Sequence, residues 1–133
     1  CTKVVVIGSR GMLPGSTGDR VIQDLRPHAG PLGGIEALLA SGVDSQYLVC
    51  ACDVPRIGAE LLRSLVDAPA GAIAVVPRVT GRDHTEPLPA RLSMAALPIV
   101  TRLLDGGHRA VCGNSCANSM QWKFPFPAIG LIN

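Results

Sequence analysis

The chain has 133 residues, of which 47% are hydrophobic and only 3% are aromatic, so it is long enough to bury a core, and that core must be aliphatic. Twelve basic and ten acidic residues give a net charge of +2, which argues against nucleic acid as a partner. The apolar stretches are too short to cross a membrane, and five cysteines, an odd number, fit a reducing compartment. We therefore expect one soluble, cytoplasmic domain, whose oligomeric state the composition does not determine.

Aliphatic and β-branched runs predict five strands, and apolar residues at helical spacing predict three helices. In chain order these are strands at 3–7 and 21–24, a helix from Ile35 that stops at Gly42, a strand at 46–52, a helix at 58–66, a strand at 72–77, a helix at 95–104 and a strand at 128–132. Glycine and proline mark irregular loops at 12–19 and 27–34. Strands that alternate with helices, without internal repeats, predict an α/β fold around a mainly parallel sheet.

A carboxylate follows directly on the predicted strand at 46–52, in the segment Cys50-Ala51-Cys52-Asp53-Val54-Pro55. In open parallel sheets, ligands bind outside the carboxyl ends of the strands, and a short carboxylate there can hold a divalent cation against a phosphate. Asp53 is therefore the first candidate for a functional residue. The alternative is an ordinary role in opening a turn or capping the next helix, since Asp is favoured in both positions.

The segment Gly30-Pro31-Leu32-Gly33-Gly34-Ile35 has three glycines where a loop leads into a helix. Backbone without side chains can approach a ligand closely, and the free N–H groups of a helix start favour an anion. The segment matches neither a P-loop nor the Gly-x-Gly-x-x-Gly fingerprint. Glycines needed for tight packing of the helix on the sheet are the alternative interpretation.

A polar turn is expected at Gly81-Arg82-Asp83-His84, after the strand at 72–77. Arg82, Asp83 and His84 offer a cation, a carboxylate and an imidazole to a substrate, although solvated turn residues explain the same pattern.

Four of the cysteines form two close pairs, Cys50 with Cys52 and Cys112 with Cys116. Alternation along a strand would put Cys50 and Cys52 on one face, where they would act as small hydrophobic side chains. A zinc site with four thiolates is the functional alternative, but the spacing is not that of a zinc ribbon or knuckle.

Taken in order, these segments resemble the molybdenum cofactor guanylyltransferase family, the MobA-like nucleotidyltransferases. The similar blocks, which cover most of residues 3–110, are Val4-Val5-Val6 with Val21-Ile22-Gln23-Asp24, Gly30 to Ile35, Leu48 to Pro55, Gly81 to His84 with Pro87-Leu88, and Leu104-Asp105-Gly106-Gly107-His108-Arg109. The resemblance implies the Rossmann-like three-layer α/β/α sandwich of the nucleotidyltransferase fold. It also implies an enzyme that transfers GMP from GTP to molybdopterin, with release of pyrophosphate and with Mg²⁺.

The resemblance also implies roles for individual residues. By position, Asp53 matches the catalytic carboxylate that holds Mg²⁺, and Asp24 matches an aspartate that contacts the nucleotide. Gly30 and Gly34 match glycines of the loop beside the nucleotide. Asn133 resembles the Asn of the family's closing Asn-Thr-Pro segment, a second ligand position near the metal.

By the same resemblance, the chain is expected to begin at what corresponds to the family's second strand, without the glycine-rich nucleotide loop that follows the first. Ile7 stands where the family has a polar nucleotide contact, and Gly130 replaces a family Asn. We therefore expect a single partial nucleotidyltransferase-like domain over 1–133, truncated at the N-terminus, that binds GTP poorly and turns over little. Alternatives are a non-catalytic scaffold related to NTP transferases and an enzyme specific for CTP or a sugar phosphate.

Overall fold

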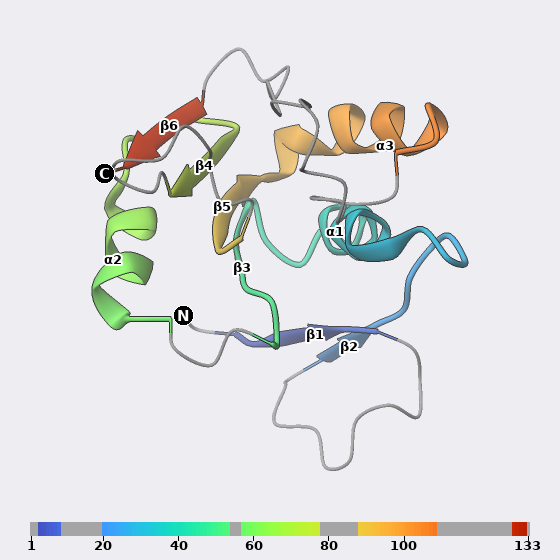
Figure 1. Cartoon of the computed structure of the whole chain (residues 1–133), viewed down its shortest axis with the longest axis horizontal. Helices are drawn as coiled ribbons and strands as arrows, with labels where there is room; N and C mark the ends of the chain where they lie inside the picture. The colour runs from blue at the N-terminus through green and yellow to red at the C-terminus, as the bar shows by residue number, and fades with distance from the viewer. Residues whose placement is uncertain (1–2, 9–19, 54–56, 78–87, 109–128, 133) are drawn as a thin grey trace, which may run out of the picture. The chain divides into compact units, whose positions relative to one another are not determined.

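The computed structural model describes residues 3–8, 20–53, 57–77, 88–108 and, for the backbone, 129–132 (Figure 1). Several expected features lie outside these residues: the loop at 12–19, the turn with Arg82, Asp83 and His84, the cysteines Cys112 and Cys116, and Asn133. The chain divides into two compact units. The first consists of Cys1–Val43 and Leu97–Val111, and the second of Asp44–Ala96 and Cys112–Asn133.

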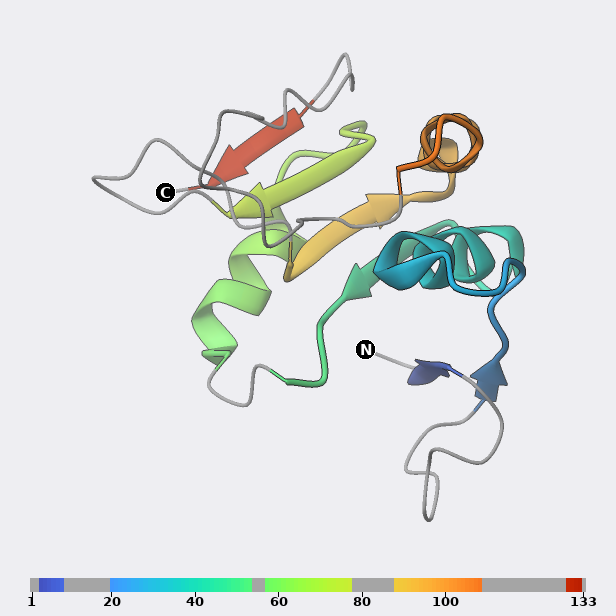
Figure 2. The ribbon, with the colours of Figure 1, turned by 45° about the vertical axis from the view of Figure 1, so that its right-hand side comes forward.

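The first unit pairs a two-stranded parallel sheet with two helices. Strand β1 (Val5–Ile7) runs parallel to β2 (Arg20–Ile22). Helix α3 (Leu97–Asp105) packs on helix α1 (Gly30–Ala40), and Figure 2 looks along α3 while α1 lies across the view, so the two helices cross. The buried apolar side chains of the unit are Ile22, Leu32, Ile35, Leu38, Leu39, Val100 and Leu104.

The apolar spacing predicts that the helix starts at Ile35, but helix α1 begins five residues earlier, at Gly30. Pro31 occupies the first turn, where its fixed φ suits a helix and its missing N–H is not needed. The helix ends as predicted beside Gly42, which has a φ of +61°. The backbone N–H of Ser41 donates to the carbonyls of Ala37 and Leu38, and its hydroxyl donates to Leu38 at 2.6 Å. The glycine-rich segment is therefore the first turn of the helix rather than a loop before it.

The second unit is a four-stranded sheet with a helix on one face. The strands are β3 (Gln46–Val49), β4 (Ala74–Pro77), β5 (Ala90–Ser93) and β6 (Ile129–Ile132), in the spatial order β3-β5-β4-β6. The short 3₁₀ helix η1 (Met94–Ala96) follows β5. Helix α2 (Ala59–Asp67) buries Leu65 completely against Ala68 and Val75.

The α/β class predicted from the alternation of elements is confirmed. The described pairing is mixed, because β4 and β6 are parallel whereas β5 is antiparallel to both β3 and β4. An antiparallel strand within an otherwise parallel sheet is common in large α/β proteins. The sequence pattern did not predict β5, because a charged residue stands in the middle of this four-residue strand.

That residue, Arg91, is only 7% exposed. The strand register places it beside Leu48 on β3 and Val75 on β4, on the face that carries α2. Its guanidinium donates to the carbonyl oxygens of Val66, Ala68 and Pro69 at 3.2, 2.8 and 2.8 Å. Carbonyls at the end of a helix have no intrahelical donors and carry partial negative charge, so the buried cation is matched by backbone dipoles.

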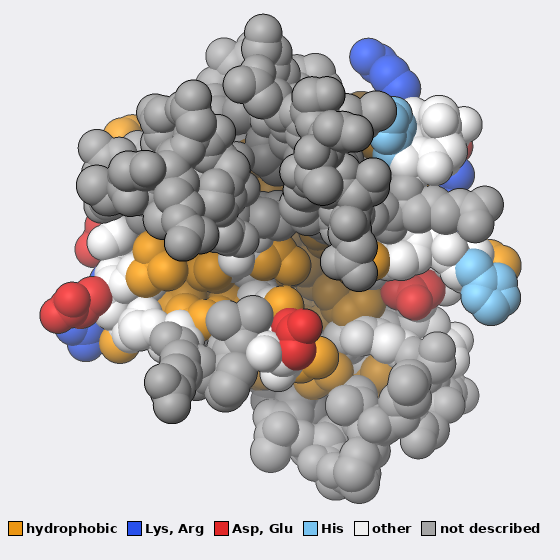
Figure 3. Space-filling model, in the orientation of Figure 1, with side chains coloured by type: hydrophobic (Ala, Val, Ile, Leu, Met, Phe, Trp, Pro, Cys, Tyr) orange, Lys and Arg blue, Asp and Glu red, His pale blue; other side chains and the backbone are white. Residues whose placement is uncertain are grey.

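Charge is otherwise dispersed. On the face drawn in Figure 3, the described Lys, Arg, Asp and Glu side chains are scattered and form no field of one sign. None of the helices in the described ranges is both long enough and apolar enough to cross a bilayer.

Replacing Arg91 tests its role at the end of α2. Arg91→Met should lower the free energy of unfolding by about 2–4 kcal/mol, because three carbonyls lose their donor, and Arg91→Lys should cost roughly half as much. Urea unfolding followed by circular dichroism measures both. The control is Arg63→Met on the exposed face of α2, which should change stability by less than about 0.5 kcal/mol. Equal effects of Arg91→Met and Arg63→Met would contradict the assignment.

Candidate functional site

Asp24 and Gly34, which belong to two separate sequence blocks, lie against each other in the first unit. A methyl group built on the Cα of Gly34 would lie 3.4 Å from Oδ1 of Asp24 and 3.2 Å from Cγ2 of Ile7. The absence of a side chain at Gly34, the fifth residue of α1, thus lets the carboxylate and the end of β1 approach the helix. The structure brings together two of the residues that the family resemblance assigns to the nucleotide.

The carboxylate of Asp24 is available to a ligand. Asp24 is exposed, and it makes no hydrogen bond or ion pair with any residue that the structure describes. A carboxylate only accepts hydrogen bonds and is repelled by phosphate, so this position suits the hydroxyl or amino donors of a ligand.

The glycines before and within the first turn of α1 have distinct structural reasons. Gly30 has a φ of +66°, a conformation that glycine adopts without strain, and His28 two residues earlier has a φ of +57°. A methyl group on Gly33 would lie 2.5 Å from Cβ of Ala29. Tight packing of the helix on the sheet, one of the two interpretations left open by the sequence, is supported for Gly34, which meets Ile7 of β1, whereas Gly33 packs on the N-cap of its own helix. The proposed contact of Gly30 and Gly34 with a nucleotide stays a prediction.

The start of α1 also offers backbone donors. Its N-cap residue is Ala29, which supplies no side-chain hydrogen bond to the first turn. The N–H groups at a helix start carry partial positive charge and point outward along the axis. They suit an anion such as a phosphate group.

The packing of Gly33 can be tested by adding one methyl group. Gly33→Ala should destabilise the chain by about 1–2 kcal/mol, because overpacking against Ala29 exceeds the helix propensity gained. Gly58→Ala is the matched control, since a methyl group there would meet nothing within 4 Å, and it should change stability by less than about 0.5 kcal/mol. Thermal unfolding measures both variants. A stabilised Gly33→Ala variant would show that Ala29 moves aside at little cost to make room for the methyl group.

Asp53 lies in the second unit, in a turn that follows β3. The strand ends at Val49 rather than Cys52, so the turn is three residues longer than expected and Asp53 is exposed. It makes no hydrogen bond or ion pair with the described residues. A solvent-facing carboxylate fits a hard divalent cation, which prefers oxygen ligands. No cluster of three or more His, Cys, Asp or Glu side chains occurs within the described ranges, so the metal role of Asp53 stays a prediction.

The early end of β3 corrects the interpretation of Cys50 and Cys52. Both are exposed free thiols in the loop, not small hydrophobic residues within a strand, and strand alternation does not apply to them. A zinc site that includes them would need Cys112 and Cys116, which lie outside the described residues. Although Cys50 is exposed, neighbouring atoms shield its thiol from part of the solvent, and this desolvation raises its pKa above the ordinary value.

Alkylation tests the environment of Cys50. Because the thiolate is the reactive form and the folded chain favours the neutral thiol, Cys50 should react with iodoacetamide more slowly at pH 8 in the folded chain than in urea. The difference should shrink as the pH rises above the raised pKa. Peptide mass spectrometry after timed quenching follows each cysteine separately. Faster reaction of Cys50 in the folded chain would contradict a raised pKa of its thiol.

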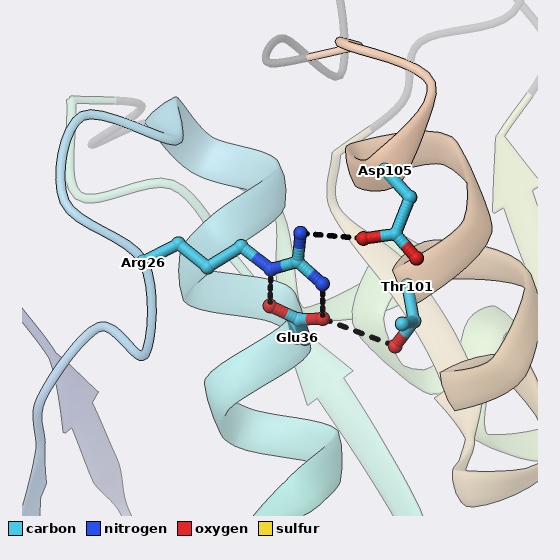
Figure 4. Close-up of polar contacts among 4 residues, drawn as sticks. All are labelled: Arg26, Glu36, Thr101 and Asp105. Atoms are coloured by element: carbon cyan, nitrogen blue, oxygen red, sulfur yellow. Dashed lines mark hydrogen bonds and ion pairs between the residues drawn. The ribbon is translucent and has the colours of Figure 1, made fainter.

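Sequence reasoning missed a cluster of polar side chains in the first unit: Arg26, Glu36, Thr101 and Asp105 (Figure 4). Glu36 is only 4% exposed, although it lies in the middle of the otherwise apolar helix α1. A single acidic residue within an apolar run is the signal that could have been used, because a buried carboxylate requires donors nearby. The positions of the donors, Arg26 and Thr101, in the sequence do not show that they lie beside Glu36.

Comparison with known proteins identifies the class. A family model described as the MobA-like NTP transferase domain matches residues 1–119. The chain therefore belongs to the MobA-like nucleotidyltransferase family, which confirms the resemblance seen in its motifs.

Particular relatives carry more specific names. The molybdenum cofactor guanylyltransferase of Pseudomonas fluorescens is 36% identical over 94 residues, which are 69% of this chain and 46% of that protein. A probable molybdenum cofactor guanylyltransferase of Pelotomaculum thermopropionicum is 37% identical over 87 residues, which are 65% of this chain and 42% of that protein. The chain thus spans less than half the length of these relatives.

A solved structure supports the same fold. The crystal structure of molybdopterin-guanine dinucleotide biosynthesis protein A from Archaeoglobus fulgidus superposes with a TM-score of 0.57 at 29% sequence identity. The match covers 69% of this chain and 46% of that chain. The nucleotidyltransferase fold expected from the sequence is therefore confirmed.

Proposed function

We propose that the protein to which this chain belongs transfers GMP from GTP to molybdopterin and releases pyrophosphate. Membership of the MobA-like family and the names of the similar proteins support this reaction. The structural observation that carries it is the approach of Asp24 to Gly34 in α1, because it joins two family blocks around a carboxylate that has no partner among the described residues.

In this proposal the first unit binds the nucleotide. Asp24 accepts hydrogen bonds from donors on the base or ribose of GTP, as an acceptor-only group beside a helix start can do. The backbone at Gly30 and Gly34 comes close to the nucleotide because neither residue has a side chain. The N–H groups in the first turn of α1 face the negative charge of a phosphate.

The second unit supplies the carboxylate for the metal. Asp53 and Asn133 would hold a divalent cation, which we propose to be Mg²⁺ and which would offset the charge of the reacting phosphates. In phosphoryl transfer most of the catalytic effect comes from positioning and neutralisation of charge, so one exposed carboxylate can have a large effect. Arg82, Asp83 and His84 are proposed to contact the acceptor substrate.

The role of Asp53 is tested by a substitution that keeps its shape. Asp53→Asn in the full-length protein should lower kcat by about 100-fold or more, because an amide holds a divalent cation less well than a carboxylate does. Pyrophosphate release with GTP, molybdopterin and Mg²⁺ measures the rate. Asp67→Asn, another exposed aspartate of the second unit at the end of α2, is the control and should retain activity. Full activity of Asp53→Asn would remove the metal assignment.

A non-catalytic scaffold is the second candidate, favoured by the aliphatic side chain of Ile7 at a position where the family has a polar nucleotide contact. The Cγ2 atom of Ile7 packs toward Gly34, so this side chain fills space beside the proposed nucleotide contact. Calorimetry of the full-length protein with GTP, CTP and ATP in the presence of Mg²⁺ separates the candidates. Heat with GTP supports the enzyme, heat with CTP alone changes the substrate, and no heat with any nucleotide supports the scaffold.

A further inference from the structure

Four polar side chains from three segments of the first unit form one connected cluster (Figure 4). Arg26, in the segment between β2 and α1, donates from Nε to Oε2 of Glu36 at 2.8 Å and from Nη2 to Oε1 at 3.0 Å. Its Nη1 donates to Oδ1 of Asp105 at 2.7 Å. The hydroxyl of Thr101 on α3 donates to Oε1 of Glu36 at 3.0 Å. Glu36 thus receives three hydrogen bonds from two different segments.

Burial makes this cluster more than a surface ion pair. Glu36 is 4% exposed, whereas Asp105 at the other end of the cluster is largely solvent-facing. Replacing a buried ion pair by apolar residues of similar volume is often neutral or stabilising, so packing of α1 alone does not require a charge at this position. The hydrogen bond with Glu36, followed by that with Asp105, raises the pKa of the Arg26 guanidinium, which is in any case always charged.

The segment that Arg26 anchors is the segment that carries Asp24. Residues 23–29 are neither strand nor helix. Three of its residues meet α1 in turn: Asp24 lies against Gly34, Ala29 against Gly33, and Arg26 against Glu36. The first two contacts are van der Waals approaches to glycine. The third is a bidentate, charge-assisted pair of hydrogen bonds, which fixes the orientation of the Arg26 guanidinium as well as its distance from Glu36.

We propose that Glu36 is a positioning residue, which acts through Arg26 to hold residues 23–29 on α1 and thereby keeps the carboxylate of Asp24 beside Gly34. Thr101 fixes the rotamer of Glu36 from α3, and Asp105 holds the outer edge of the guanidinium. Glu36 itself touches no substrate. The effect of Glu36 on the nucleotide rests on the proposed function of Asp24, whereas the anchoring of residues 23–29 does not.

Nitrogen-15 relaxation of the backbone amides tests the anchoring without any ligand. Glu36→Gln puts an amide N–H₂ group opposite the Arg26 donors, and Thr101→Val removes one hydrogen bond while keeping the side-chain shape. Either variant should lower the order parameters of the amides in 23–29 from about 0.85 to below about 0.6, with α2 unchanged. Glu60→Gln, on the exposed first turn of α2, is the matched control. Unchanged order parameters at 23–29 would overturn the proposal, and Thr101→Val keeps the test open if Glu36→Gln fails to fold.

A double-mutant cycle in the full-length protein tests the link to Asp24. Glu36→Gln should weaken GTP binding about 10-fold in the parent protein but by less than about twofold when Asp24→Asn is already present. A purely structural effect of Glu36 would weaken binding equally in both backgrounds, and that result would overturn the link. If the parent protein binds no nucleotide, the proposed function fails, and the relaxation measurement alone decides the anchoring.

Discussion

The first unit depends on one electrostatic constraint, which is that the buried carboxylate of Glu36 must be matched. A carboxylate taken out of water loses strong hydration, and the loss is recovered only when donors surround its oxygens. Arg26 and Thr101 provide those donors from the segment before α1 and from α3. The requirement of one side chain therefore links helix α1, helix α3 and the irregular segment at 23–29.

The second unit also buries a charged side chain, but its hydrogen-bond partners are of a different kind. Arg91 is buried within β5, yet its three hydrogen bonds go to backbone carbonyls beyond and at the end of α2 rather than to a carboxylate. A strand that carries this residue is held in place by a helix end as well as by its neighbours in the sheet. In both units a single charge within an apolar element fixes the position of a neighbouring segment.

Sequence reasoning missed the partners of Glu36 and the strand that carries Arg91. Continuous aliphatic runs predicted β1 and β4 well, because buried strands are apolar on both faces. Apolar residues at helical spacing predicted α2, because a helix that buries one face leaves a periodic pattern in the sequence. The strand β5 and the early start of α1 were not predicted, since Arg91 and the glycines contradict the local preferences of a strand and a helix. Those preferences were overridden by contacts with residues distant in sequence, which periodicity does not encode. The nucleotide candidates, by contrast, came from the order of family blocks, and the meeting of Asp24 and Gly34 agrees with that order.

The approach of Asp24 to Gly34 also limits what this part of the chain can recognise. A carboxylate and the N–H groups of a helix start carry opposite charges, so a ligand that reached both would have to combine hydrogen-bond donors with an anionic group. A nucleotide has this combination in its hydroxyl or amino groups and its phosphates, whereas a simple anion such as inorganic phosphate would be repelled by Asp24. Under the proposed function, the fit of a nucleotide to Asp24 would depend on how firmly residues 23–29 are held on α1. The Arg26–Glu36 pair is the charge-assisted contact that holds them.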